Sequence, residues 1–285
     1  MAKPLQAFAV VSLLFVMGTG GCGSQRSTRE EAPPPPVREI DPAAVLESYN
    51  QRLVGVDRLW ARVTLVVEGA DDEGGRFKEQ AEGHLQIERP DRVALSLGKL
   101  GDERLYLGAD EDRYWWIDRI DPDDRYAVVG RHDLITPSKL EAIGLPLRPA
   151  HLVELLGIQP IPASQLSAYE GGALIVTRPD GLRMRVRLID DGPEAATVTL
   201  AQDGRAIASA KLTDYETVTV EADRRIHPRI ATEIAIRAPE INGIARLRLY
   251  EPTNRDISLA AFDFEKLVRG YRVRDVTDLD EGGAE

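Results

Sequence analysis

Apolar and polar residues alternate along most of the chain after residue 56. An alternation with a period of two is typical of half-buried strands, because successive side chains of a strand point to opposite faces of the sheet. Short runs rich in Asp, Gly and Pro interrupt the alternation, for example at 70–75 and at Arg89-Pro90-Asp91. The pattern therefore predicts an antiparallel sheet of many strands with one apolar face.

Seven residues of the apolar parity are expected to project to one concave side of this sheet, where they would line any ligand cavity. They are Leu65, Leu85, Leu95, Leu107, Trp115, Met184 and Leu247. Parity decides the choice, because every second residue of a strand returns to the same face. Trp116 follows Trp115 directly and must point the other way. With Tyr114 and Tyr106, Trp116 is expected either to form an exposed aromatic patch or to lie under a helix or loop.

Two segments have a helical pattern instead. Asp41 suits an N-cap and Pro42 suits the first position of a helix that carries apolar residues as far as Leu53. The second segment, 140–158, lies between two groups of strands. A long apolar sheet face must be covered from water, so both segments are expected to fill the concave side. The second would act as a central helical lid through Leu152, Leu155 and Leu156.

The order of these elements resembles the LolA/LolB lipoprotein-localisation fold over Pro42 to Val276. The shared features are a helix, strands around a Gly-rich turn, Arg89-Pro90-Asp91 before a strand, an aromatic strand, helices and further strands. The segment 140–158, with Gly144-Leu145-Pro146-Leu147, resembles the lid of the LolB branch. Phe262, Phe264 and 270–273 resemble the closing strand of that superfamily.

This resemblance implies a mainly β (α+β) fold: a single strongly curved antiparallel sheet or unclosed β-barrel with an N-terminal helix and a central helical lid. It also implies a hydrophobic cavity that receives acyl chains. It assigns no functional side chain of the family to a position in this sequence.

The first residues resemble a bacterial lipoprotein signal peptide. Lys3 supplies a positive charge, an apolar run covers 5–17, and small residues lead to Cys22, the one cysteine of the chain. The apolar run is too short to span a bilayer stably. Similarity to the lipobox implies that Cys22 is diacylated, although Thr19 stands where that pattern prefers Leu. The alternatives are an ordinary secretory signal with an incidental cysteine, or a buried N-terminal helix.

The chain is thus expected to have four parts: a signal peptide (1–21), a lipidated cysteine with a disordered Pro-rich tether (22–40), a β domain (41–274) and an acidic disordered tail (275–285). The tether contains Pro33 to Pro36 and almost no apolar residue, so burial cannot offset the entropy of ordering it. Gly23 follows the cysteine where Asp would retain a lipoprotein in the inner membrane of enteric bacteria. By that resemblance the periplasmic face of the outer membrane is favoured over the inner membrane.

Charge narrows the set of partners. The formal net charge is −11, which argues against a nucleic-acid partner because phosphates require a basic excess. With one cysteine, the chain cannot form an internal disulfide. Arginines occupy the polar parity of two strands: Arg183, Arg185 and Arg187 on one, and Arg246 and Arg248 on the other. They form either a solvated sheet face or a contact for lipid phosphates or an acidic partner.

No catalytic residue, metal site or cofactor is expected. The sequence has no GxSxG elbow or P-loop, its histidines are widely separated, and the acidic cluster at 118–124 lacks the EF-hand glycine and distal Glu.

The leading hypothesis is a non-enzymatic envelope lipoprotein, held at the membrane by its lipid, that binds a lipophilic ligand or lipoprotein acyl chains in an apolar cavity. The alternative is a structural or scaffolding lipoprotein with a side-chain-filled core that docks an envelope protein partner. An envelope hydrolase is a third hypothesis.

Overall fold

A computed structural model describes residues 40–70, 74–121, 123–136, 148–190, 192–221, 225–239 and 243–281. They belong to one compact unit, 40–285. The predictions for the signal peptide, Cys22, most of the tether, and 140–147 of the lid segment lie outside the described residues. Among the described residues, no helix combines the length and the hydropathy needed to cross a membrane.

The strands belong to one sheet. They span Arg58–Ala70 (β1), Arg76–Glu88 (β2), Arg92–Lys99 (β3), Asp102–Ala109 (β4), Arg113–Asp118 (β5), Tyr126–Arg131 (β6), Leu166–Glu170 (β7), Ala173–Thr177 (β8), Arg183–Leu188 (β9), Ala195–Gln202 (β10), Arg205–Thr217 (β11), Thr219–Val220 (β12), Arg229–Arg237 (β13), Gly243–Asn254 (β14) and Asp275–Asp278 (β15).

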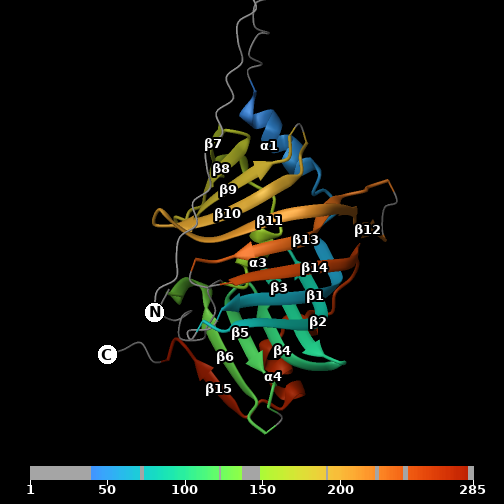
Figure 1. The fold of residues 1–285 in the computed structure, drawn as a ribbon, viewed down its shortest axis with the longest axis vertical. Helices are drawn as coiled ribbons and strands as arrows, with labels where there is room; N and C mark the ends of the chain where they lie inside the picture. The colour runs from blue at the N-terminus through green and yellow to red at the C-terminus, as the bar shows by residue number, and fades with distance from the viewer. Residues whose placement is uncertain are drawn as a thin grey trace, which may run out of the picture. The chain divides into compact units, whose positions relative to one another are not determined.

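The sheet consists of two meanders that meet at its centre (Figure 1). Its order is β15-β6-β5-β4-β3-β2-β1-β14-β13-β11-β10-β9-β8-β7, and β12 pairs with β14. The pairs are antiparallel except β12–β14 and β15–β6, which are parallel. The path of strand pairing has two ends, β15 and β7, so the sheet is not closed into a barrel. The predicted mainly β, unclosed fold is confirmed, with parallel pairs added at two places.

Among the described residues, three α-helices and three 3-10 helices accompany the sheet. They span Pro42–Gln51 (α1), His132–Leu134 (η1), His151–Leu155 (α3), Ala163–Gln165 (η2), Leu259–Phe262 (η3) and Phe264–Tyr271 (α4). The Asp41 side chain accepts a hydrogen bond from the Ala43 amide at 2.9 Å and caps α1. This contact satisfies one of the backbone donors that a helix leaves free at its N-terminus.

Hydrophobic clusters lie on both faces of the sheet. The larger cluster joins α1 and α3 to one face, which we call the inner face. A row of directly opposed residues on that face crosses six strands, from β1 to β6: Ala61, Leu85, Leu95, Leu107, Trp116 and Val128. The smaller cluster packs η3 and α4 against the opposite, outer face of β3 to β6. Residues of β3 and β4 are therefore packed on both faces of the sheet.

The prediction for Trp115 is wrong. Leu107, on the inner face, pairs with Trp116. Trp115 pairs with the next residue, Gly108, and therefore points to the outer face. It is buried there against Phe264, with 5.7 Å between the ring centroids. A Cβ atom at Gly108 would lie 2.3 Å from Trp115 Nε1, so a glycine is required beneath the indole.

Of the two alternatives for Trp116, the exposed aromatic patch is absent from the described residues. Trp116 is half-buried on the inner face, whereas Tyr106 is buried on the outer face. The Tyr106 hydroxyl donates a hydrogen bond to the carbonyl oxygen of Ala261 at 2.6 Å.

The C-terminal segment differs from both predictions made for it. Phe262 and Phe264 belong to η3 and α4, not to a closing strand, and the Asp263 side chain caps α4 by accepting from the Lys266 amide at 3.0 Å. The predicted disordered tail begins with β15, which pairs with β6. An edge strand leaves a row of backbone groups unpaired, and β15 satisfies those of β6.

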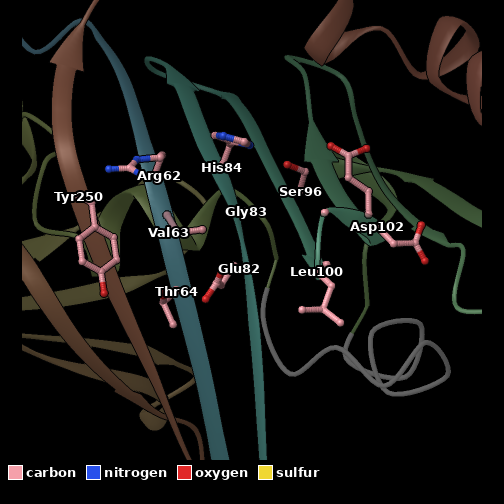
Figure 2. A pocket seen from close by; sticks show the side chains of 13 residues that line it. Arg62, Val63, Thr64, Glu82, Gly83, His84, Ser96, Leu100, Asp102 and Tyr250 are labelled. Atoms are coloured by element: carbon pink, nitrogen blue, oxygen red, sulfur yellow. The ribbon is translucent and has the colours of Figure 1, made fainter.

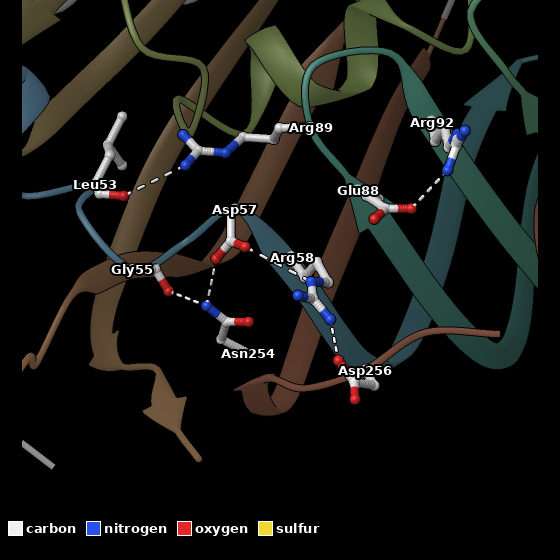
Figure 3. Close-up of polar contacts among 9 residues, drawn as sticks. All are labelled: Leu53, Gly55, Asp57, Arg58, Glu88, Arg89, Arg92, Asn254 and Asp256. Atoms are coloured by element: carbon white, nitrogen blue, oxygen red, sulfur yellow. Dashed lines mark hydrogen bonds and ion pairs between the residues drawn. The ribbon is translucent and has the colours of Figure 1, made fainter. Parts of the chain in front are cut away.

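Polar contacts fix the corner where α1 leads into β1 (Figure 3). The Asn254 amide donates to the Asp57 carboxylate at 2.7 Å and to the Gly55 carbonyl oxygen. Arg58 pairs with Asp57 at 3.6 Å and with Asp256. Asn254 and Asp256 lie close to 200 residues away in the sequence, so this corner joins the start of β1 to the end of β14.

Candidate functional site

The inner face holds six of the seven predicted cavity residues: Leu65, Leu85, Leu95, Leu107, Met184 and Leu247. Leu65 and Leu247 are direct cross-strand partners at the centre of the sheet. Leu85, Leu95, Met184 and Leu247 are buried, whereas Leu65 and Leu107 are half-buried. The structure brings these side chains together, and their contact with a ligand stays a prediction.

The predicted lid residues pack into the same cluster. Leu155 is 0% exposed and Leu156 is 2% exposed, whereas Leu152 is half-buried at the margin. Because Leu155 and Leu156 are buried, α3 completes the hydrophobic core in this structure. Only Leu152 retains surface that a ligand can contact.

Hydrogen bonds tie α1 to the segment that follows α3. The Tyr49 hydroxyl donates to the Gly157 carbonyl oxygen at 3.1 Å, and Asn50 exchanges two hydrogen bonds of 2.9 Å with the Ile161 backbone. Arg89, from the predicted break after β2, donates to the carbonyl oxygen of Ile158 at 2.9 Å. Burial lowers the pKa of Arg89. The two helical segments therefore form one linked cover over the inner face.

The two meanders differ in how fully this cover buries them. On β8 to β10 the inner residues are buried, as Leu174, Val186 and Leu200 show. The first meander and α3 keep a half-buried apolar surface, formed by Leu65, Ala81, Leu105, Leu107, Trp116 and Leu152. We call this set the apolar surface. On this part of the inner face the apolar side chains are partly accessible, so an apolar ligand group can contact them.

A buried polar cluster lies beside the apolar surface. Glu154 of α3 is 3% exposed and accepts a hydrogen bond from Arg178, whose guanidinium also lies 3.3 Å from Asp180. Tyr114 is two residues before Trp116 on the inner face of β5, and its ring centroid is 5.8 Å from that of His132. This cluster joins the first meander, α3 and the turn between β8 and β9.

Burial sets the protonation states in this polar cluster. It raises the pKa of Glu154, and the nearby Arg178 opposes that rise. Burial, with the charges of Arg148 and Arg178, lowers the pKa of His151 to about 3, and burial raises the pKa of Tyr114 to about 12. His151 and Tyr114 are therefore uncharged at neutral pH.

Three buried atoms of the polar cluster have no hydrogen-bond partner in the part of the chain that the structure describes. They are His151 Nδ1, Glu154 Oε2 and the Tyr114 hydroxyl oxygen. Leaving a buried polar atom unsatisfied costs about 1–3 kcal/mol, so each atom is a position where water or a polar ligand group would stabilise the fold.

Sequence reasoning missed this polar cluster. A usable signal was the charged Glu154 and the polar His151 inside a short helix whose other residues, Leu152, Val153 and Leu155, are apolar. The pairing of Glu154 with Arg178 had no local signal, because 24 positions separate the two residues.

A cleft of about 540 Å³ lies mainly among outward-facing residues of the first meander (Figure 2). Figure 2 shows Arg62 and Thr64 on β1, Glu82 and His84 on β2, and Tyr250 on β14 among its lining residues. Its mixed charges do not suit an acyl chain. Among the described residues, no group of three or more His, Cys, Asp or Glu side chains could hold a metal ion.

The fold is similar to folds seen in solved structures, whereas the sequence alone has no match. No family model and no curated protein matches the sequence. A domain from Vibrio parahaemolyticus, described as an outer membrane lipoprotein-sorting protein, aligns with 80% of this chain and 99% of its own length at 12% identity and a TM-score of 0.50. A LolA superfamily protein from Nitrosomonas europaea aligns with 79% of this chain and 99% of its own length at 10% identity and a TM-score of 0.49. The alignment with the Vibrio domain bears out the fold that the sequence predicted, and a likeness at this identity concerns the fold alone.

Proposed function

We propose that the chain is a non-enzymatic lipoprotein of the cell envelope that binds a lipophilic ligand, or the acyl chains of a lipoprotein, on its inner face. One observation carries the proposal: a half-buried apolar surface lies beside buried polar atoms that have no hydrogen-bond partner among the described residues. An amphiphile has the matching chemistry, with an apolar chain and a polar head. The shared fold with a domain described as lipoprotein-sorting supports the same class of ligand.

The apolar surface supplies the driving force in this proposal. Each methylene that leaves water for an apolar contact contributes about 0.8 kcal/mol. An acyl chain along Leu65, Leu107 and Trp116 would cross the first meander from β1 to β5. A head group at the Tyr114 end would then meet the atoms of His151 and Glu154 that have no partner within the described ranges.

The second proposal is a scaffolding lipoprotein whose core is filled by its own side chains. The burial of Leu155, Leu156 and the inner residues of β8 to β10 favours it, because no ligand is needed to complete that part of the core. In this proposal the outer face would dock a protein partner of the envelope.

Thermal melting with a long-chain lipid separates the two proposals. A ligand that binds the folded state raises the melting temperature by mass action. Leu107→Gln should reduce this shift, because Leu107 belongs to the apolar surface, whereas Arg104→Gln at an exposed position of the same strand should leave it unchanged. Native mass spectrometry of protein purified from membranes should show co-purifying lipid.

The scaffold is the better account if no lipid shifts the melting temperature while Leu155→Ala is strongly destabilising. Truncation of a fully buried leucine typically costs about 2–5 kcal/mol. Leu155 is fully buried, so this variant measures how far α3 acts as core.

Membrane attachment is proposed to depend on acylation of Cys22. Cys22→Ser should give a soluble or unprocessed product, as judged by membrane fractionation and by mass spectrometry of the N-terminus. A variant that is processed and partitions like the wild type would exclude the lipoprotein anchor. Gly23 after the cysteine supports the periplasmic face of the outer membrane as the location.

A further inference from the structure

The outer face of the second meander carries a concentration of positive charge. The seven cationic side chains are exposed and come from β9, β11, β13 and β14: Arg183, Arg185, Arg187, Lys211, Arg237, Arg246 and Arg248. We call them the basic face. Figure 1 shows these strands and β10 side by side. This concentration contrasts with the whole chain, whose net charge is −11.

The strand register places these cations in rows with hydroxyl groups between them. One row of direct partners runs Arg187, Thr197, Lys211, Ala235 and Arg246 across β9 to β14. A second row runs Arg185, Thr199, Ser209 and Arg237. Because neighbouring strands lie about 4.8 Å apart, each row extends over the width of several head groups.

A cleft of about 480 Å³ lies at the centre of the basic face. Its polar lining consists of Lys211, Arg237, Arg246, Thr197, Thr199 and Ser209. Ammonium, guanidinium and hydroxyl groups all donate hydrogen bonds to phosphate oxygens. No carboxylate is among the described residues that line this cleft.

Most of the basic face has no counter-charge within the part of the chain that the structure describes. Arg246 lies 3.8 Å from Glu68, and Arg248 lies 3.4 Å from Glu233. The other five cations make no ion pair with any residue that the structure describes. Exposed charges of one sign repel one another, so an external anion would stabilise this arrangement.

We propose that the basic face binds the phosphate groups of anionic phospholipids at a bilayer surface. The cleft takes one phosphate between Lys211, Arg237 and Arg246, and the β9 arginines contact neighbouring head groups. A row of cations across five strands fits many phosphates in one plane better than a single small anion. The acidic remainder of the chain disfavours a long polyanion such as nucleic acid, whereas head groups within a Debye length of the face are attracted.

Co-sedimentation with vesicles tests this proposal. Residues 40–285 are suitable, because this compact unit contains both hydrophobic clusters and omits the predicted anchor. The fragment should bind vesicles of phosphatidylcholine mixed with phosphatidylglycerol, and should not bind phosphatidylcholine alone. Binding should weaken as salt is raised, since salt screens exposed charges.

Matched variants assign the binding to the cleft. The triple variant Lys211→Gln, Arg237→Gln, Arg246→Gln should bind the mixed vesicles about 100-fold more weakly, from three surface cations. The triple variant Lys211→Arg, Arg237→Lys, Arg246→Lys keeps the charge and should bind like the wild type. The control Lys78→Gln, Lys99→Gln, Arg104→Gln makes the same charge change on the first meander and should retain binding.

Three outcomes of the vesicle experiments would overturn the proposal. They are equal binding to both kinds of vesicle, wild-type binding by the neutral triple variant, and equal weakening by the control triple variant. Binding of duplex DNA without binding of the mixed vesicles would also overturn it and would identify a different polyanion.

Discussion

The strands β5 and β9 have six residues each, but β5 has buried side chains on both faces and β9 on one face only. In β9 the alternation is strict: its arginines are exposed, and Met184, Val186 and Leu188 are buried. In β5, Tyr114 is buried on the inner face, and Trp115 and Ile117 are buried on the outer face. The difference follows from the environment of each strand, because α4 covers the outer face of β5 and no described element covers that of β9.

The cover over the first meander is held by polar contacts as well as by packing. Arg125 donates to the carbonyl oxygen of Tyr271 at 2.8 Å, and Arg119 stacks on the Tyr271 ring at 4.1 Å. Arg113 pairs with Glu265 at 3.1 Å. The strands β3 and β4 are thus the middle of three layers, whereas the second meander has a cover on one face and a charged surface on the other.

The largest effect should come from the outer cluster. Trp115→Ala should lower the free energy of unfolding by about 3–5 kcal/mol, because it removes a fully buried indole. Its neighbour Trp116 is half-buried, so Trp116→Ala should cost roughly half as much. Urea unfolding of both variants measures this difference. Equal losses would contradict the assignment of the two rings to different layers.

The second meander allows the same test within one strand. Met184→Ala removes a buried side chain of β9 and should cost about 2–5 kcal/mol. Arg185→Gln, on the exposed face of that strand, should change stability by no more than about 0.5 kcal/mol. A loss above this limit for Arg185→Gln would show that the basic face contributes to folding.

The sequence was sufficient to predict the inner face where the sheet has one apolar side. Leu65, Leu85, Leu95, Leu107 and Leu247 were assigned by parity alone, and the structure places all five in one cluster. Parity failed at β5, because both faces of this strand are apolar. The sequence of such a strand does not indicate which face points to the inner cluster.

The helix α4 was missed because two phenylalanines, Phe262 and Phe264, alternate as strand residues do. The correct signal was Asp263 as an N-cap before Phe264, Leu267, Val268 and Tyr271 at helical spacing. The polar cluster could not be predicted, because chain folding alone brings residues of β5, α3 and the β8–β9 turn together.

The polar cluster links the two meanders and should make stability depend on pH. The pKa of His151 falls from 6.5 to about 3 on folding, so between these values the unfolded state binds more protons. The free energy of unfolding should therefore fall by about 2 kcal/mol from pH 7 to pH 5 through this residue. The raised pKa of Glu154 acts in the opposite direction, because its protonation favours the folded state as the pH falls.

The variant His151→Gln isolates the contribution of the histidine. It should lose the destabilisation on acidification that the wild type shows, as measured by urea unfolding at pH 7 and pH 5. His84→Gln is the control, because His84 is exposed on β2. An unchanged pH dependence in His151→Gln would exclude His151 as its origin.

The smallest effect concerns β15, which extends the sheet at β6. Removing residues 275–285 deletes the hydrogen bonds from the Leu279 amide to the Val129 carbonyl oxygen at 2.9 Å and from the Arg131 amide to Asp280 at 2.8 Å. We expect a loss of about 1–2 kcal/mol, since each hydrogen bond contributes roughly 0.5–1.5 kcal/mol. Amide hydrogen exchange should accelerate in β6 and stay unchanged in β9. Removing only residues 281–285 leaves both contacts and should have no effect. If the longer truncation leaves the protection of β6 unchanged, β15 does not contribute to the stability of the first meander.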